Sequence, residues 1–214
     1  MKKNLSKCLL VTALSLILSA SAILAQTSSS EIEQSILNEL NEARANPQTY
    51  ITYLEEHKKK FKGSRADYPD FVMETFEGTA AVDEAIKFLK KQSKLAPLTF
   101  SEALSKPAKL QLNDLIENPT LGHKGKDGSN LPKRLSKFGI KPTSHYAENI
   151  MQDANLPRQI VLWLIIDDGV KDRGHRKNIF DKAFKQVGIS YGLAKNGRGV
   201  SVMVFAGTFI ETAK

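Results

Sequence analysis

Cysteine is almost absent from this sequence. The only one among 214 residues is Cys8, close to the N-terminus. A chain of this length can bury enough apolar surface to be stable without disulfides. The composition therefore excludes a disulfide-stapled fold, and it excludes a cysteine nucleophile once the N-terminal segment has been removed.

Long apolar segments are also lacking, and the short one at the N-terminus is typical of a targeting signal. Three lysines and an apolar run over Leu9–Leu18 are followed by small residues at Ala20–Ala22. The run is too short to compete well as a membrane-spanning helix. We expect a signal peptide over residues 1–25 that is cleaved on export. Together with the missing disulfides, this favours a secreted or periplasmic bacterial protein.

Positive charge is in moderate excess. Without the three leader lysines, 28 basic residues face 23 acidic ones, a net charge of +5. Part of the excess lies in the basic run Lys58–Lys62, which is either a patch for anionic polymers or a solvated loop. No nucleic-acid fold signature accompanies the run, so we favour the solvated loop and expect no nucleic-acid partner.

The chain after the leader shows no internal repeat and no second domain boundary. We therefore expect a polar linker over residues 26–30 and one domain over residues 31–214. Residues 58–70 are basic and contain glycine, and they are predicted to form a loop. Apolar residues at helical spacing predict helices elsewhere. These helices centre on residues 32–43, 50–54, 82–89, 104–115 and 160–164.

Local signals predict where some of the helices begin. Ser30 and Glu33 fit a capping box at the start of the first helix. Pro107 predicts either a kink or a helix start near Ser105. Asn155 is the predicted N-cap of the helix that follows it.

Near the end of the chain, the spacing of the apolar residues changes from helical to alternating. Residues 187–193 and 200–206 alternate in polarity on either side of Asn196–Gly197, a hairpin turn signal. This pattern predicts an antiparallel pair of strands with one strongly apolar face. Many helices around a small antiparallel sheet form an α+β pattern.

Four short elements in the second half carry the candidate chemistry. Two histidines and one glutamate lie in separate elements, so they act together only if the fold brings them close. Such a cluster is able to bind a divalent metal or to work as a polar catalytic group. The elements are Gly122-His123-Lys124-Gly125, Ala147-Glu148-Asn149-Ile150, Val161-Leu162-Trp163-Leu164 and Gly174-His175-Arg176-Lys177-Asn178-Ile179.

The order of these elements resembles the CAP superfamily, also called SCP-like, which includes cysteine-rich secretory proteins, antigen 5 and plant pathogenesis-related proteins. Leu40–Pro47 and Ala96–Phe100 are similar to two further blocks of bacterial, single-domain members. The resemblance therefore covers nearly the whole mature chain. It implies an α+β fold, a three-layer α-β-α sandwich with a small antiparallel sheet.

In that family, two histidines and two acidic residues form a central cavity. The resemblance assigns three of these positions to His123, His175 and Glu148. The second glutamate normally lies just after the tryptophan, where this chain has isoleucine followed by Asp167 and Asp168. Either aspartate is a candidate for that position.

A metal is the cofactor that this residue set suggests. Two neutral imidazoles and one carboxylate make an ordinary zinc shell with room for a water. We expect zinc or another divalent metal at His123, His175 and Glu148, with the second acid as a base or as an outer partner. From spacing alone, the alternative is that these residues hold polar turns together through hydrogen bonds.

The resemblance implies a cleft rather than a reaction. Family members act mostly as extracellular binding modules for sterol, lipid or protein ligands, and a few are linked to proteolysis or divalent metals. We interpret the chain as an exported, monomeric binding module for an extracellular lipid, polymer or protein, and not as an enzyme. The alternative is a metal-dependent, peptidase-like hydrolase that acts on an extracellular or envelope polymer.

Other candidate residues have simpler interpretations. Gly188–Gly192 fits the G-x-S-x-G nucleophile motif, but the motif lies in an alternating strand and no histidine follows it. His145 is a candidate for the rim of the cleft, and His57 beside the lysine run is expected to be solvated. Trp163, on an apolar helix, is predicted to lie in the core.

Overall fold

The computed structural model describes residues 29–212, so the predicted leader and most of the predicted linker lie outside the described residues. Residues 29–45 are helical, and α2 (Pro47–Lys58) follows after Asn46. Asn46 has φ −132° and ψ 62°, which fits the exclusion of the residue before a proline from the α region. Within residues 29–212, no helix is long and apolar enough to cross a membrane.

A four-stranded sheet lies at the centre, with strand order β4-β7-β8-β6. The predicted hairpin forms its middle, since β7 (Gln186–Leu193) pairs antiparallel with β8 (Gly199–Ala206). β4 (Thr99–Phe100) pairs parallel with β7. β6 (Tyr146–Gln152), which the sequence did not predict as a strand, pairs antiparallel with β8 and forms one edge.

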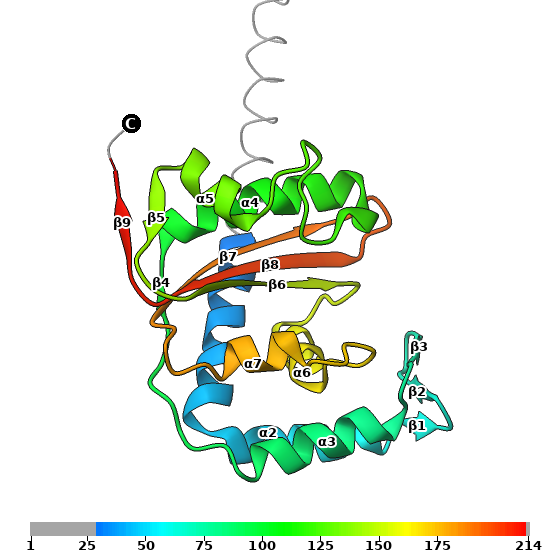
Figure 1. Ribbon diagram of the computed structural model, residues 1–214. Coiled ribbons are helices and arrows are strands. Elements are labelled where there is room, and N and C mark those ends of the chain that lie inside the picture. Colours follow the sequence, from blue (N-terminus) through cyan, green and yellow to red (C-terminus); the bar gives the residue numbers. More distant parts are fainter. Residues whose placement is uncertain (1–28, 213–214) are drawn as a thin grey trace, which may run out of the picture.

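Helices cover both faces of this sheet, which confirms the three-layer α+β sandwich (Figure 1). One layer holds α4 (Glu102–Glu117) and α5 (Leu131–Lys137). The other layer contains the helix over residues 29–45 together with α2, α3 (Thr79–Leu89), α6 (Pro157–Ile166) and α7 (Gly174–Ile179). The remaining small elements are η1 (Pro119–Leu121), β5 (Ile140–Pro142) and β9 (Phe209–Glu211).

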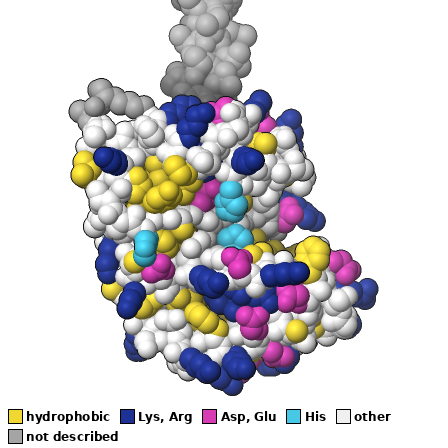
Figure 2. All heavy atoms as spheres, in the orientation of Figure 1, with side chains coloured by type: hydrophobic (Ala, Val, Ile, Leu, Met, Phe, Trp, Pro, Cys, Tyr) yellow, Lys and Arg dark blue, Asp and Glu magenta, His cyan; other side chains and the backbone are white. Residues whose placement is uncertain are grey.

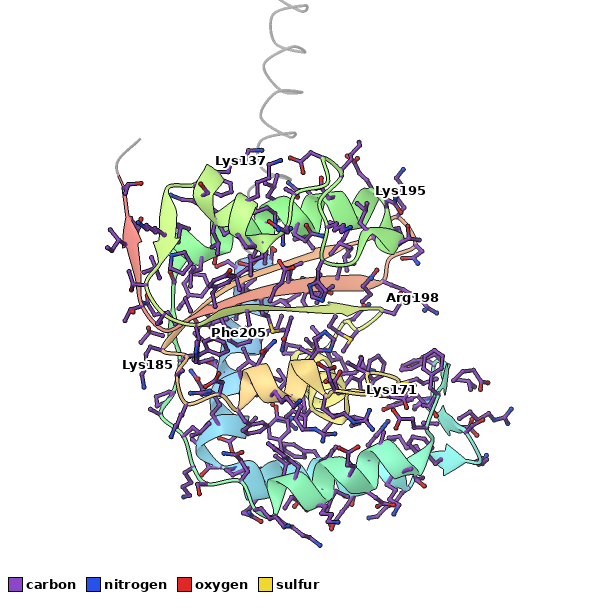
Figure 3. The ribbon with its side chains drawn as sticks, in the orientation of Figure 1. Lys137, Lys171, Lys185, Lys195, Arg198 and Phe205 are labelled. Atoms are coloured by element: carbon purple, nitrogen blue, oxygen red, sulfur yellow. The ribbon has the colours of Figure 1, made fainter. Side chains whose placement is uncertain are left out.

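β8 separates two hydrophobic cores. Its side chains alternate between the cores, with Val202 and Val204 packing toward α4 and α5. Met203 and Phe205 belong to the core of the other helical layer, and Phe205 points from the sheet in that direction (Figure 3). The predicted single apolar face was therefore wrong, because every residue of β8 is buried between two helical layers.

Gly188 explains how closely α4 approaches the sheet. A Cβ at this position would lie 2.1 Å from the carbonyl carbon of Leu104 and 2.2 Å from the nitrogen of Ser105. Only glycine fits such a close contact between a strand and a helix backbone. The G-x-S-x-G segment is thus part of β7, with Ser190 buried, and it is not a nucleophile elbow.

The loop predicted over residues 58–70 was wrong. The chain there and just beyond it folds into a three-stranded antiparallel sheet of β1 (Phe61–Lys62), β2 (Arg65–Asp67) and β3 (Val72–Glu74). This small sheet projects at one end of the helical layer that holds α2 and α3 (Figure 1). Three lysines of the basic run form ion pairs with carboxylates, so the run is largely neutralised. The pairs are Lys58–Asp83, Lys59–Glu56 and Lys62–Asp67.

Two predicted capping interactions were wrong because the side chains have long-range partners. Glu33 lies inside the first helix and accepts the backbone N–H of Tyr191 at 2.9 Å. Asn155 accepts the backbone N–H of Gly199 at 2.6 Å and so holds the end of the hairpin. Neither residue is used as its local sequence pattern predicted.

The start of α4 decides between the two alternatives that Pro107 left open. Ser101 is its N-cap and accepts the backbone N–H of Leu104 at 3.3 Å. The helix therefore begins at Glu102 and not near Ser105, and Pro107 lies inside it.

Candidate functional site

His123 lies in the loop after η1, and hydrogen bonds from α4 hold this loop in place. Gln111, a fully buried residue of α4, donates to the carbonyls of Gly122 and Lys124 at 2.5 and 3.0 Å. Arg134 of α5 donates to the carbonyl of His123 itself at 3.1 Å. The loop is therefore held on both sides of the histidine. The sequence analysis missed both supporting residues, because a polar side chain on a predicted helix gives no sign that it is buried.

Glu148 connects this loop to the sheet. His123 Nδ1 lies 2.9 Å from Glu148 Oε1, and the Arg134 guanidinium donates to Glu148 Oε2. The side chains of Glu148 and Arg134 are 3% and 0% exposed, respectively. Both carboxylate oxygens thus have a partner. One partner is a buried cation and the other is the ring that Glu148 orients.

Asp167 plays the matching role for His175. Asp167 ends α6 in the left-handed conformation, with φ 59° and ψ 42°. This turn directs its carboxylate at the start of α7, where Oδ1 lies 2.7 Å from His175 Nδ1. The second oxygen accepts the backbone N–H groups of His175 and Arg176 at 2.9 and 3.3 Å. Aspartate and asparagine are among the residues that best tolerate this backbone region.

The other candidate aspartate is used elsewhere. The Asp168 carboxylate accepts the backbone N–H groups of Phe76 and Glu77 at 2.8 and 2.9 Å. It therefore holds the segment that leads into α3. Of the two aspartates that the sequence left open, Asp167 is the one that contacts a histidine.

The fold brings the two histidines together. Their ring centroids are 6.3 Å apart, with an angle of 31° between the rings. The edge strand β6 contributes to both sides of this pair, because successive side chains of a strand point to opposite faces. Glu148 holds His123, whereas the next residue, the buried Asn149, donates to the carbonyl of His175 at 3.1 Å. The Ala147–Ile150 motif thus joins the two halves of the site.

The two histidine side chains reach the surface between the two helical layers, and their carboxylate partners are buried behind them. Figure 2 shows histidine side chains near the middle of this face, with acidic side chains beside them. The His123 side chain is 57% exposed, and the His175 side chain is 22% exposed. The site is therefore accessible to a dissolved ligand, although its supporting residues are buried.

Two other predicted positions differ from the sequence interpretation. His145 does not join the pair, since its side chain is 75% exposed and lies 3.9 Å from Asp181. His57 is not solvated. It is buried, its Nδ1 lies 2.6 Å from the Tyr68 hydroxyl, and burial together with nearby Lys60 lowers its pKa to about 4. The small β1–β3 sheet, which the sequence did not predict, covers it.

Trp163 lies at the edge of the core and not within it. It is partly buried, and its ring meets those of Tyr68 and Phe71 edge-on at centroid distances of 6.4 and 6.2 Å. The prediction of a core tryptophan was therefore only partly right, because one part of the side chain lines a cavity.

The paired carboxylates determine which nitrogen each histidine presents. A carboxylate accepts hydrogen bonds, so in the neutral tautomer that fits these contacts Nδ1 carries the proton and Nε2 keeps its lone pair. This arrangement is the one by which carboxylates orient metal-binding histidines. Within residues 29–212, no group of three or more His, Cys, Asp or Glu side chains is arranged to hold a metal ion.

The chain was compared with known proteins. The model of the cysteine-rich secretory protein family, CAP, matches residues 37–206. The uncharacterized protein YkwD of Bacillus subtilis (strain 168) is 27% identical over 103 residues, which is 48% of this chain. The match spans 37% of the length of that curated relative.

Solved structures show weaker similarity. An outer surface protein from Borrelia burgdorferi is 19% identical, with a TM-score of 0.44, and the match covers 68% of this chain and 98% of that one. An extracellular protein containing a SCP domain from Bacillus anthracis str. Ames is 16% identical, with a TM-score of 0.42 and coverage of 62% and 39%. A cysteine-rich secretory protein from Staphylococcus aureus subsp. aureus Mu50 is 17% identical, with a TM-score of 0.39 and coverage of 60% and 37%.

Proposed function

Because the chain belongs to the CAP family, we propose that it is an exported binding module whose cleft holds a divalent cation, zinc in the first instance, between His123 and His175. The observation that carries the proposal is the pair of imidazoles, each with its Nδ1 bonded to a buried carboxylate. Such bonds fix the ring and leave Nε2 free to bind a metal.

The distance between the rings is close to the largest that one shared ion allows. A Zn–N bond of about 2.0–2.1 Å puts a ring centre about 3.2 Å from the metal, so two rings on one ion lie at most about 6.4 Å apart. The observed 6.3 Å corresponds to a nearly linear arrangement, and a tetrahedral angle would require the ring centres to move about 1 Å closer together. We assign Glu148 the role of a positioning partner, since its two oxygens contact the His123 ring and the Arg134 guanidinium.

Export is supported by the sequence at the N-terminus. The lysines, the apolar run and the small residues up to Ala25 have the order of a cleavable signal. Although the family is named for being rich in cysteine, this chain has a single cysteine, Cys8, which lies inside that leader. The exported domain would depend on its two hydrophobic cores and not on disulfides.

Calorimetric titration with zinc tests the proposal. Replacing His123 or His175 by alanine should abolish the tight site, because each supplies half of the protein ligands. His145→Ala is the matched control, since this histidine is exposed and outside the cleft. Binding should also weaken in acid, because protons compete with the metal for imidazole. If the His175→Ala variant bound zinc with wild-type affinity, the proposed metal site would be refuted.

A hydrolase is the second candidate, since an ion held by two protein ligands leaves positions for water and substrate. It is the weaker candidate because both nearby carboxylates are bonded to the histidines, and neither is free to act as a base toward a bound water. The same variants separate the two functions. Turnover of an envelope polymer that disappears with both histidine variants would favour the hydrolase.

A further inference from the structure

The small β1–β3 sheet forms part of the wall of a cavity of about 320 Å³ beside His175. β1 and β3 contribute Phe61 and Met73 to the lining, and α6 contributes Trp163. The sheet projects from one end of its helical layer (Figure 1), and Ala66 is the one buried residue in its three strands. A unit with so few buried residues is able to open locally while the rest of a domain stays folded.

His57 is the polar group that is buried under this sheet. It lies in the last turn of α2, is 2% exposed and also lines the cavity. The Phe61 ring of β1 packs edge-on against the imidazole, with the ring centroids 5.2 Å apart. The Tyr68 hydroxyl, just after β2, lies 2.6 Å from Nδ1. The second ring nitrogen, Nε2, is buried and has no hydrogen-bond partner among the described residues.

No anion is positioned to compensate a proton on this ring. Within residues 29–212, His57 forms no ion pair with a carboxylate, and the charge that acts on it is the ammonium of Lys60, which repels a proton. Burial and Lys60 together lower the pKa of His57 to about 4, so the covered ring is neutral at physiological pH. The charged groups on the surrounding elements have other partners or are exposed: Lys58 pairs with Asp83, Lys59 with Glu56, Lys62 and Arg65 with Asp67, Arg158 with Glu39 and Asp167 with His175, Asp168 accepts backbone N–H groups, and Glu55, Asp70 and Glu74 are exposed.

Acid therefore opposes the closed position of the sheet. When the sheet leaves the ring, His57 regains its ordinary pKa of about 6.5. The open form then binds a proton more tightly than the closed form, so the equilibrium shifts toward opening as the pH falls from about 6.5 to 4. Between pH 7 and pH 5, this difference in pKa raises the ratio of open to closed molecules about 20-fold.

We propose that the β1–β3 sheet is an acid-sensitive lid on the cavity, and that a proton on His57 releases it. Opening removes the β1 and β3 side chains from the cavity lining and leaves Trp163 and His175 accessible. Tyr68 and Phe71, whose rings meet that of Trp163 edge-on, move with the lid. The lid goes beyond the proposed metal site and does not depend on a metal, because His57 is not one of the two metal-binding histidines.

Hydrogen–deuterium exchange of the backbone amides, followed by mass spectrometry, measures how often the lid opens. Exchange is recorded at pH 7 and pH 5 with a chelator present, and each rate is corrected for the intrinsic effect of pH. Corrected exchange over residues 61–74 should rise about 20-fold at pH 5, whereas that of β7 and β8 should stay unchanged. Carboxylates beside the lid stay ionised in this range, because hydrogen bonds from Lys62 lower the pKa of Asp67 and those from Arg173 lower the pKa of Glu77 to about 2.

Two variants test whether His57 is the sensor. His57→Phe keeps an aromatic ring against Phe61 but takes up no proton, so its corrected exchange should not depend on pH. Lys60→Met keeps an apolar stem over the Tyr68 ring and removes the ammonium, so the rise at pH 5 should be smaller than in wild type. His145→Ala is the matched control, since this histidine is exposed, and it should behave like wild type. Circular dichroism checks that each variant is folded.

Each outcome supports or refutes the lid. A rise of wild-type size in His57→Phe would overturn the proposal, because another group would then be the sensor. Unchanged corrected exchange in wild type would mean that the sheet stays closed, and an equal rise in β7 and β8 would mean that the whole domain unfolds. Either result would also overturn the proposal. None of them bears on zinc binding by His123 and His175, which is measured without chelator.

Discussion

The ion pair between Glu148 and Arg134 allows a quantitative test of the site. Both side chains are almost fully buried, and the guanidinium donates to one carboxylate oxygen while His123 contacts the other. Glu148→Gln keeps the shape of the side chain but removes its charge, which leaves the guanidinium buried without an anion. Removing one partner of a buried pair costs about 3–5 kcal/mol. That is a large share of the roughly 5–15 kcal/mol by which a domain is usually stable.

The assay is chemical unfolding followed by far-ultraviolet circular dichroism. Glu117→Gln is the control, since it breaks an ion pair with Lys126 that is exposed on both sides, and it should leave the midpoint unchanged. The double variant Arg134→Met with Glu148→Met should be more stable than the Glu148→Gln single variant, because an apolar pair carries no desolvation cost. A Glu148→Gln protein within about 0.5 kcal/mol of wild type would show that the pair is not buried as described.

Asp167, His57 and the N-terminal signal each allow a further test. Asp167→Asn should fold, because asparagine accepts the left-handed turn, but zinc affinity measured by calorimetry should fall about 10–100-fold since the amide no longer holds His175 in one tautomer. Stability should fall as pH drops from about 6.5 to 4, because His57 takes up a proton in the unfolded chain before the folded one. His57→Phe should reduce this loss by up to about 3 kcal/mol, and an unchanged pH dependence would argue against a buried neutral ring. N-terminal sequencing of exported protein should begin between Ile23 and Gln26; an intact leader would contradict cleavage.

The helices and the hairpin could be predicted from the sequence because their apolar residues recur at clear helical or alternating spacing. The alternation over β7 and β8 and the Asn196–Gly197 turn sufficed to place the centre of the sheet. β6 could not be found in this way. It carries polar residues such as Glu148 and Asn149, which are buried only because they have specific partners, so its composition resembles that of a loop. Strand propensity depends on the neighbours of a strand, which the sequence does not show.

Half of the candidate site was predictable and half was not. The histidines could be named from the motifs, but the choice between Asp167 and Asp168 depends on one backbone turn. A left-handed residue at the end of α6 points the first carboxylate to His175 and the second toward the start of α3. Arg134 was missed because a basic residue on a short helix is usually exposed, whereas here Glu148 and the carbonyls of His123 and Ser129 give the buried guanidinium its partners.

The two histidines come from opposite layers of the sandwich, so a metal bound by both would affect the stability of the whole fold. His123 is held by the α4 and α5 layer, whereas His175 begins α7 in the other layer, and β6 lies between them. An ion that binds both imidazoles would therefore connect the layers and stabilise the native state against the unfolded one. The gain is about 2.7 kcal/mol when free metal is 100 times its dissociation constant.

This coupling can be measured as a shift in thermal unfolding. Zinc should raise the melting temperature of the wild-type protein and leave that of the His123→Ala and His175→Ala variants unchanged, because each variant leaves the ion attached to one layer only. His145→Ala should respond like wild type, since its side chain lies outside the cleft. If zinc raised the melting temperature of either cleft variant as much as that of wild type, the ion would not be bridging the layers. The carboxylates would then serve the fold, with Glu148 connecting His123 to the sheet and Asp167 holding His175 at the start of α7.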